Sequence, residues 1–545
     1  MDALELGTLY ESLERSVAKH GDRPAYAVPP MVGRAYHPDG AEFTWTQTLV
    51  ATQQQIRRYR EAGYGPGQRV AILFQQRPEF IFHFYALNAL GCSVVPINPD
   101  YLHDEMVYQL EHSESCLALA IDERIDEVRS AAAALAQPIP VARFEGHGPL
   151  PLATSAAEDF RPAGTTEAAL LYTSGTTGRP KGCILSNVYF HSFGLSYVSR
   201  GGLLALREGQ ERLYNPLPLH HANCLAIALP AMLLSGGCLI FPDRFHASTF
   251  WHEVIACRVT ALQLQGVIPS ILLKLPEVPE ERQHQVRFAL CWGMEPVYHQ
   301  PFEDRTGIPV VESWTMTEIG RLMTNHVEPR QIHTRSVGRP SEGLEARVVN
   351  AQDEDMPAGE TGELVVRHSA EAPRKGFFTA YLKNPDATAE AWRGGWFHTG
   401  DMASRDENGI FYYVDRQKNI IRRSGENIAA TEVEECLTAH PQVKQVVVMA
   451  VRDELREEEV MACVIPQSQD DAGEALAHEL FEWCWARLAY FKAPGWVLFV
   501  DKLPTTSSQK LKRVGMFPQG TDPCAQPGVV DLRSLKKKSA SQTSA

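Results

Sequence analysis

Short apolar runs alternate with longer amphipathic segments over most of the chain. Apolar runs of strand length predict buried strands at residues 69–74, 92–96, 115–121, 168–172 and 237–241. Between the first two, residues 78–90 carry apolar side chains at helical spacing and predict a helix. Strands that alternate with helices in this way are typical of α/β proteins.

The pattern changes from Gly338 onward to short strands separated by turns, such as the run 362–367. A further small unit is expected after Asp415, with a helix over 430–439 and strands at 445–449 and 461–465. The last residues, 533–545, are basic and polar, and we expect them to be disordered.

Composition narrows the class of protein. The chain has 545 residues, of which 44% are hydrophobic and 22% charged, as in an ordinary globular protein of several folding units. A net charge of −14 argues against a nucleic-acid or anionic-membrane binder. The eleven cysteines are scattered, which favours reduced thiols in a cytoplasmic protein. We find no signal peptide and no apolar run long enough to span a bilayer.

The loop Tyr172-Thr-Ser-Gly-Thr-Thr-Gly-Arg-Pro-Lys-Gly182 follows the predicted strand 168–172. Its glycines allow backbone N–H groups to approach phosphate oxygens, its hydroxyls add donors, and its cations offset negative charge. It is not a Walker A loop, because Pro180 precedes Lys181 and Gly182 follows it. The alternative is a polar surface turn, but composition, order and the preceding strand together favour a phosphate site.

Four other segments combine polar side chains with strand ends or turns: 313–318, 395–401, 411–427 and 503–512. Each has a structural explanation when taken alone. Trp314 could be a core aromatic, Asp401 a turn or cap residue, Glu318 a surface charge and Lys510 a solvated lysine. Their joint order along the chain is what favours a functional interpretation.

This order resembles the superfamily of adenylate-forming enzymes, which includes acyl- and aryl-CoA synthetases, peptide-synthetase adenylation domains and beetle luciferases. The resemblance extends from about Leu9 to Lys512. The spacing of His221-Ala-Asn-Cys224 and the turn Ser424-Gly-Glu-Asn-Ile428 are most similar to the crotonobetaine/carnitine-type CoA ligases.

The resemblance implies an α/β fold with two domains. Residues 1–415 would form a large N-terminal domain with two sandwiched α/β sheets and a small β-barrel-like subdomain. Residues 416–532 would form a small, mobile α+β domain with its hinge at Lys418, followed by the basic tail.

The resemblance also implies the reaction. A carboxylate attacks the α-phosphate of ATP, pyrophosphate leaves, and the thiol of coenzyme A (CoA) intercepts the acyl-adenylate. The first step joins two anions and therefore needs cations and N–H donors more than a general base. The expected partners are a small carboxylic acid, ATP, Mg²⁺ and CoA, with no nucleic acid and with a possible homodimer.

Residue roles follow from the same resemblance. The β- and γ-phosphates would be held by Thr173, Ser174, Gly175, Thr176, Thr177, Gly178 and Lys181. Thr317 would contact the α-phosphate, Glu318 would ligate Mg²⁺, and Lys510 would neutralise charge as carboxylate and phosphate meet. Asp401 and Arg416 would bind the ribose. The adenine would lie between Trp314, where the family usually has tyrosine, and the segment Gly293, Met294, Glu295 and Pro296. The remaining candidates are the catalytic His221, Thr315 beside the nucleotide, and the CoA-facing hairpin residues Arg422, Ser424, Gly425 and Glu426.

The chain departs from the family pattern at three positions. Thr315 stands where glycine is usual, which should shrink or polarise the acyl site. Gln509 replaces the commoner glycine before Lys510. Trp292 falls in the acyl-pocket region, where it and Trp314 would favour a compact acid and could receive a quaternary ammonium group, unless both aromatics merely pack.

Three interpretations therefore remain open. The first is a CoA ligase, which the motif set favours. The second is an adenylating enzyme that loads a carrier protein, although no carrier domain follows Lys510. The third is a non-catalytic nucleotide-binding relative, against which Glu318, Asp401, Arg416 and Lys510 argue together.

Overall fold

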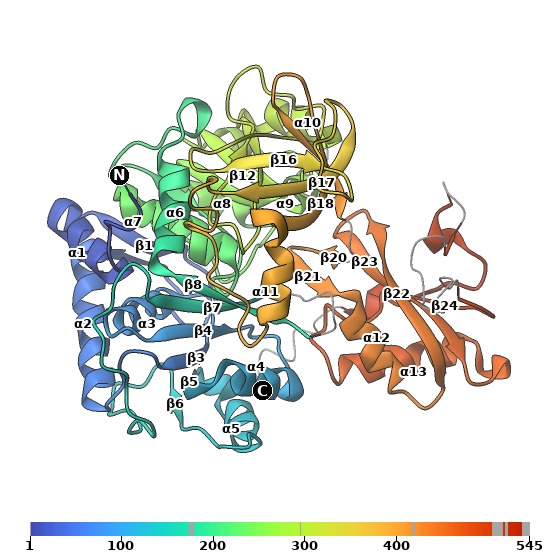
Figure 1. Ribbon diagram of the computed structural model, residues 1–545, viewed down its shortest axis with the longest axis horizontal. Helices are drawn as coiled ribbons and strands as arrows, with labels where there is room; N and C mark the ends of the chain where they lie inside the picture. Colours follow the sequence, from blue (N-terminus) through green and yellow to red (C-terminus); the bar gives the residue numbers. More distant parts are fainter. Residues whose placement is uncertain are drawn as a thin grey trace. The chain divides into compact units, whose positions relative to one another are not determined.

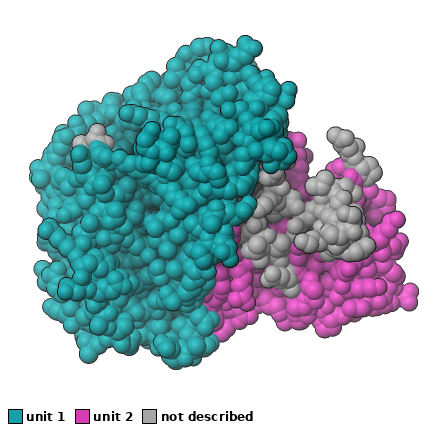
Figure 2. Space-filling model, viewed as in Figure 1, with its two compact units in different colours: residues 1–99, 110–171, 182–417 teal, residues 100–109, 172–181, 418–545 magenta. Residues whose placement is uncertain are grey.

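The computed structural model describes residues 2–173, 179–294, 296–416, 420–503, 516–517 and 521–536. Figure 1 shows the helices and strands with their labels. The chain forms two compact units, coloured separately in Figure 2. Unit 1 contains residues 1–99, 110–171 and 182–417, and unit 2 contains residues 100–109, 172–181 and 418–545.

One sheet of six strands is built mainly from the N-terminal third of the chain. In spatial order its strands are β6 (Val141–Arg143), β5 (Ser115–Ala120), β3 (Arg69–Leu73), β4 (Ser93–Ile97), β7 (Glu167–Thr173) and β8 (Lys181–Ser186). The pairs from β6 to β7 are parallel. All five residues of β4 are buried, as expected for a parallel strand covered on both faces.

A second sheet has thirteen strands and carries the candidate nucleoside residues. Its order is β16 (Glu345–Val349), β17 (Thr361–Arg367), β18 (Phe397–Arg405), β19 (Phe411–Arg416), β15 (Ser336–Pro340), β14 (Met323–Thr324), β13 (Val310–Trp314), β12 (Phe288–Trp292), β11 (Ala261–Gln265), β9 (Arg212–Tyr214), β10 (Cys238–Ile240), β1 (Pro24–Val28) and β2 (Ala41–Thr44). Pairing is parallel from β13 to β1 and antiparallel from β13 to β16. The antiparallel strands expected as a barrel-like subdomain thus continue this sheet.

Helices accompany these sheets in unit 1 (Figure 1). They include α1 (Leu9–His20), α2 (Trp45–Glu61), α3 (Pro78–Ala89), α5 (Ile125–Ala133), α6 (Asn187–Val198), α7 (Leu229–Ser235), α8 (Phe250–Ala256), α9 (Val267–Lys274), α10 (Pro296–Thr306) and α11 (Pro385–Ala391), while α4 (His103–Ser113) begins in unit 2 and ends in unit 1. Helix α1 begins at a capping box, in which Thr8 and Glu11 bind each other's backbone N–H groups. Helix α3 is buried almost all round, which explains its nearly continuous apolar sequence.

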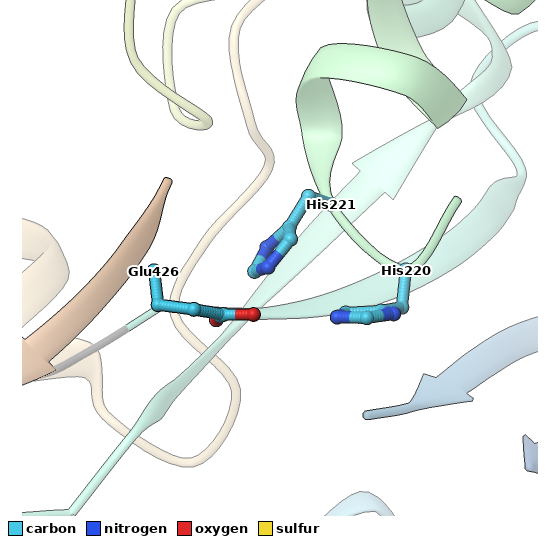
Figure 3. A group of neighbouring side chains, drawn as sticks. All are labelled: His220, His221 and Glu426. Atoms are coloured by element: carbon cyan, nitrogen blue, oxygen red, sulfur yellow. The ribbon is translucent and has the colours of Figure 1, made fainter. Parts of the chain in front are cut away.

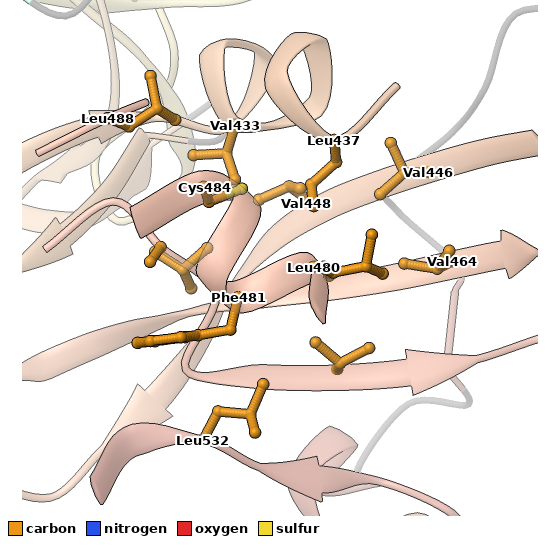
Figure 4. Packing of buried hydrophobic residues seen from close by; sticks show 14 of the residues in the cluster. Val433, Leu437, Val446, Val448, Val464, Leu480, Phe481, Cys484, Leu488 and Leu532 are labelled. Atoms are coloured by element: carbon orange, nitrogen blue, oxygen red, sulfur yellow. The ribbon is translucent and has the colours of Figure 1, made fainter. Parts of the chain in front are cut away.

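The C-terminal part of unit 2 is an α+β fold. Its sheet has the order β21 (Glu426–Ala429), β20 (Ile420–Arg423), β23 (Glu457–Pro466), β24 (Trp496–Phe499) and β25 (Val530–Asp531), with β22 (Val443–Asp453) also paired to β23. Helices α12 (Ala430–Thr438) and α13 (Glu474–Trp485) pack their apolar residues against the sheet (Figure 4). Leu532, which follows β25, belongs to the same buried cluster.

A buried ion-pair cluster lies inside unit 2. The ammonium group of Lys492 is 2.5 Å from a carboxylate oxygen of Glu105 and 2.8 Å from one of Glu432. Burial opposes the charge on Lys492, but the two carboxylates outweigh it and raise the pKa of the lysine. Residues 100–109 therefore belong to the same compact unit as the C-terminal residues.

The end of the chain is ordered beyond the boundary expected from its composition. The first four residues of the tail that was expected to be disordered form the 3-10 helix η8 (Arg533–Lys536). The ordered chain thus reaches at least Lys536, because buried contacts compensate for the loss of conformational entropy there. Among the described residues, no helix is both long and apolar enough to span a bilayer.

Candidate functional site

The candidate residues of unit 1 follow the carboxyl ends of neighbouring parallel strands. Strands β11, β12 and β13 run side by side and end at Gln265, Trp292 and Trp314. The segments that leave them begin at Gly266, at Gly293 and at residue 315, which brings three separated parts of the sequence to one edge. In open α/β sheets, ligands bind at this edge of the strands.

The segment expected to face adenine is held by a buried carboxylate. Glu312, on β13, accepts hydrogen bonds from the backbone N–H groups of Gly293 (2.5 Å) and Met294 (3.3 Å). Gly293 has φ of +73°, a conformation that favours glycine. A Cβ atom on Gly266 would collide with the carbonyl of Gly293, so these two backbones lie in direct contact. Glu295 lies outside the described residues, and Pro296 begins α10.

Trp314 and Asp401 are hydrogen-bonded to each other. The indole Nε1 of Trp314 donates to Asp401 Oδ2 at 2.8 Å, and both side chains are buried. Asp401 lies on β18, where its position is opposite Arg416 of β19. The expected nucleoside residues thus come together in unit 1 as a connected group, although Trp314 already occupies one oxygen of the carboxylate.

Thr317 and Glu318 are fixed by two tyrosines. Tyr189, on α6, donates its hydroxyl to the carbonyl of Thr317 at 2.5 Å. Tyr381 donates its hydroxyl to Glu318 Oε1 at 2.8 Å, and Glu318 is 6% exposed. A carboxylate held in one orientation is suited to a metal ion or to a developing charge, because little reorganisation is needed when the ligand binds.

The turn that carries these residues depends on close packing. Thr315 donates its hydroxyl to the carbonyl of Arg321 at 2.6 Å and so closes the turn from within. A Cβ atom on Gly320, whose φ is +69°, would collide with the carbonyl of Gly376. The hydroxyl of Thr315 therefore has its partner within the turn.

His221 precedes the π-helix η3 (Asn223–Ala228), in the segment that follows β9. Its imidazole centroid is 4.4 Å from that of His220, and Figure 3 shows the two rings on adjacent residues. Gln263 of β11 donates to both the carbonyl and the side-chain oxygen of Asn223 at 2.8 Å. The His221 segment is thus tied by Asn223 to the same sheet as the nucleotide candidates.

The predicted hairpin of unit 2 is present between β20 and β21. Its two central residues, Ser424 and Gly425, have φ of 50° and 85°. Positive φ at both positions is the signature of a type I′ turn, which matches the twist of a two-residue hairpin. Arg422 and Glu426 flank the turn on β20 and β21.

The ends of the phosphate loop lie in unit 2, with Thr173 ending β7 and Lys181 beginning β8. Tyr108 donates its hydroxyl to the carbonyl of Pro180 at 2.9 Å, and the guanidinium of Arg179 lies 5.1 Å from the Tyr108 ring centroid. The predicted residues that fall outside the described part of the chain are Ser174, Gly175, Thr176, Thr177, Gly178, Glu295, Lys418 and Lys510.

Three residues of the site carry no signal in the sequence that would single them out. Glu312 is one of many acidic residues, and only the fold brings its carboxylate to the N–H groups of Gly293 and Met294. Tyr381 is 63 residues from Glu318 in the chain. Gly266 is required because its backbone contacts that of Gly293, and this contact is visible only in the folded chain. All three support other residues, and such contacts depend on tertiary structure.

Known proteins resemble this chain over most of its length. The AMP-binding enzyme family model matches residues 13–374, and the model of the AMP-binding enzyme C-terminal domain matches residues 432–510. A crotonobetaine/carnitine–CoA ligase of Citrobacter koseri is 31% identical over 490 residues, which cover 86% of this chain and 92% of the relative. One from Salmonella enteritidis is 30% identical with the same coverage.

Solved structures agree with the fold. An o-succinylbenzoate CoA synthetase mutant from Bacillus subtilis, bound to a product analogue, gives a TM-score of 0.79 at 24% identity and covers 93% of this chain and 98% of its own. A malonyl-CoA ligase in a ternary product complex with methylmalonyl-CoA and AMP gives a TM-score of 0.73 at 26% identity, covering 89% and 97%. These matches confirm the resemblance and the α/β fold class drawn from the sequence. The chain therefore belongs to the AMP-binding enzyme family, among the adenylate-forming acyl-CoA ligases.

Proposed function

We propose that this ligase activates a compact carboxylic acid with ATP, releases pyrophosphate, and passes the acyl group to CoA. The observation that carries the proposal is the group at the edge of the thirteen-stranded sheet, where Trp314 and Asp401 are hydrogen-bonded to each other and Thr317 and Glu318 are fixed by tyrosines. This group offers an aromatic face and carboxylates for a nucleoside and its metal-bound phosphates.

Adenylation would use the residues after β13. Thr317 would donate its hydroxyl to the α-phosphate, and Glu318 would hold Mg²⁺. A buried carboxylate fits this ion, because Mg²⁺ in nucleotide sites takes one or two carboxylates together with phosphate oxygens. When bound, Mg²⁺ would neutralise phosphate charge. Thr173, Lys181 and the loop between them would hold the β- and γ-phosphates.

The nucleoside would be held by side chains and backbone of unit 1. Asp401, whose carboxylate accepts from Trp314, would bind a ribose hydroxyl, with Arg416 opposite it on β19. Gly293 and Met294, fixed by Glu312, would form the backbone wall of the adenine slot.

The second half-reaction would use a mobile C-terminal domain. We propose domains at 1–415 and 416–532, a hinge at Lys418, and Lys510 as the residue that neutralises charge during adenylation. The hairpin with Arg422, Ser424, Gly425 and Glu426 would serve the CoA step, because Gly425 leaves backbone open to a thiol arm: within the described residues, nothing approaches within 4 Å of a Cβ atom built on it.

The proposed acid is short or compact, with a carnitine-like betaine as the leading candidate. Trp292 and Trp314 end adjacent parallel strands, and both are at least 90% buried. The indole Nε1 of Trp292 has no hydrogen-bond partner among the described residues. Aromatic faces attract quaternary ammonium groups, and the relatives at about 30% identity are named crotonobetaine/carnitine–CoA ligases.

Pyrophosphate release across a panel of acids, with and without CoA, tests this function. The panel contains short, branched, aromatic, long-chain and betaine-type acids at equal concentration. We expect release with a compact acid and a CoA thioester as product. Adenylate formation without thioester would favour a carrier-protein acceptor, and no release with any acid would favour a non-catalytic relative. Sedimentation of the same preparation tests the proposed homodimer.

A further inference from the structure

The base of the Ser424–Gly425 hairpin is held by three consecutive glutamates of β23. Glu457 pairs with Arg423 in the sheet, and the carboxylate of Glu458 accepts a hydrogen bond from the backbone N–H of Arg422 at 2.6 Å. Glu459 accepts from Nε of Arg423 at 2.7 Å. The turn itself is tied back through the N–H of Ser424, which donates to the carbonyl of Arg456 at 3.0 Å.

Glu459 is the buried member of this set. Its side chain and that of Arg423 are 0% and 2% exposed. One oxygen binds Arg423, and the other accepts from the N–H of Val460 at 2.8 Å. A Cβ atom on Gly495 would collide with the Glu459 side chain, so the carboxylate is packed as well as hydrogen-bonded. A charged group enclosed in this way can hold its partner Arg423 in one place.

The C-terminal extension reaches the same carboxylate. The family model of the C-terminal domain ends at residue 510, and the chain continues from there. Strand β25 pairs with β24, the N–H of Leu532 donates to the carbonyl of Gly495 at 2.8 Å, and Leu532 packs in the core (Figure 4). Lys536 then donates to Glu459 Oε1 and, at 3.2 Å, to the carbonyl of Phe491.

The surroundings of Lys536 lower the pKa of its amino group. Its side chain is 0% exposed. Burial lowers its pKa to about 7, and the positive charges of Arg423 and Arg456 act in the same direction, whereas Glu459 opposes them. The charge of Lys536 also acts on the thiol of Cys484, where it lowers the thiol pKa.

We propose that Lys536 is a positioning residue through which the C-terminal extension holds Glu459, and with it Arg423 and the base of the Ser424–Gly425 hairpin, in the geometry used for the CoA step. The chain of contacts runs from Lys536 to Glu459 to Arg423, and all three belong to one compact unit. The assignment to the CoA step rests on the function proposed above. The contact itself does not.

The test compares full-length Lys536→Met with wild type and with the control Lys444→Met, which removes an exposed lysine from β22. Three quantities are measured: pyrophosphate release, conversion of supplied acyl-adenylate and CoA to thioester, and hydrogen exchange of the hairpin amides 420–429. In Lys536→Met we expect faster exchange in the hairpin and a thioester step slower by about tenfold, the loss typical of one hydrogen bond to a charged group. Adenylation should change by less than about twofold, because the hairpin is proposed to act only in the CoA step.

A general loss of stability would not produce this result. Removing one partner of a buried pair is destabilising, so the rates are measured at a temperature at which Lys536→Met is fully folded. A general loss of stability would lower both half-reactions, whereas the proposal expects a loss in the thioester step alone. Lys536→Gln keeps an N–H donor group and should recover part of the thioester rate. If Lys536→Met does not fold, Lys536→Ala replaces it with the same expected results.

A wild-type thioester rate in folded Lys536→Met overturns the proposal, whatever the exchange shows. Unchanged exchange at residues 420–429 overturns it as well, because the hairpin would then be held without the lysine. If wild type makes no thioester at all, the proposed function has failed, and hydrogen exchange alone decides whether Lys536 positions the hairpin.

Discussion

Trp314 donates its indole N–H to the buried carboxylate of Asp401 at 2.8 Å. The two residues come from β13 and β18, which are separated by three strands in the same sheet, and they lie 87 residues apart in sequence. This hydrogen bond connects Trp314, which is expected against adenine, with Asp401, which is expected at the ribose. A nucleoside bound there would contact both residues, so a substitution of one should also weaken nucleoside binding by the other.

Trp314→Phe is therefore expected to weaken ATP binding. It removes the N–H donor but keeps an aromatic face, and it leaves Asp401 buried without that partner, which costs about 1.5–3 kcal/mol for a hydrogen bond to a charged group. We expect a higher KM for ATP and a lower unfolding free energy. Trp292→Phe is the matched control, because the Trp292 N–H has no partner among the described residues. Equal ATP KM values in the two variants would contradict the coupling.

A second prediction concerns Glu318 and the tyrosine that orients it. Glu318→Gln should lower pyrophosphate release by about a hundredfold or more, as is typical of removing one electrostatic catalytic group. Tyr381→Phe removes only the hydroxyl that donates to Glu318 Oε1 and should lower release by about tenfold, with a higher Mg²⁺ requirement. Steady-state rates at varied Mg²⁺ measure both effects. Near-normal release by folded Glu318→Gln would exclude the metal role.

Much of the architecture could be predicted from hydrophobic periodicity. The predicted strands at 69–74 and 115–121 are β3 (Arg69–Leu73) and β5 (Ser115–Ala120), and the helix predicted at 430–439 is α12 (Ala430–Thr438). These predictions are confirmed because each element is short, buried and bounded by turn residues. The length of β22 (Val443–Asp453) was underestimated, since its later residues alternate between buried and exposed positions after the apolar run ends.

The site was predictable only where a residue has an unusual chemical context in sequence. Asp401 after a glycine and Glu318 after a threonine could be singled out, and the structure places Asp401 against Trp314. Glu312 and Lys536 could not, because one looks like any strand acid and the other like a lysine of a basic tail. Both act through buried contacts with residues far away in the chain, 19 residues for Glu312 and Gly293 and 77 for Lys536 and Glu459.

The third prediction separates the volume of Thr315 from its hydroxyl. The hydroxyl donates to the carbonyl of Arg321, so Thr315→Val should loosen the turn without enlarging the acyl site. Thr315→Ser keeps the donor and removes a methyl group, and it should extend the accepted acids by a graded amount, about 1 kcal/mol of selectivity per methylene. Relative kcat/KM over a series of acids measures this. An identical acid profile in Thr315→Ser would place the residue away from the acyl group.

The fourth prediction follows from the lowered pKa of Lys536, about 7 in the folded protein against 10.5 for the ordinary group. Between these values the unfolded chain binds more protons than the folded one, so stability attributable to this group rises with pH, by up to about 1.4 kcal/mol per pH unit. Below pH 7 the amine is protonated in both the folded and the unfolded chain, and the free-energy cost of burying its charge no longer changes with pH. The unfolding free energy of wild type minus that of Lys536→Met should therefore increase from pH 7 to pH 9. A difference independent of pH would mean that the buried amine titrates normally.

The last prediction assigns the two half-reactions to different residues of the C-terminal part. Lys510→Ala should abolish acyl-adenylate formation but still convert supplied adenylate and CoA to thioester, and Gly425→Leu should do the reverse. Leucine at position 425 also strains the backbone, because φ there is 85°, in the left-handed region that favours glycine. Gly528→Leu is the matched control, because Gly528 has φ of 81°, nothing within 4 Å of a Cβ atom built there among the described residues, and no proposed role. Lys510→Ala and Gly425→Leu each affect an interaction used in only one transition state, so the loss should appear in the kcat of that half-reaction. A thioester step slowed equally by Gly425→Leu and Gly528→Leu would attribute the effect to backbone strain and contradict the role of the hairpin in the CoA step.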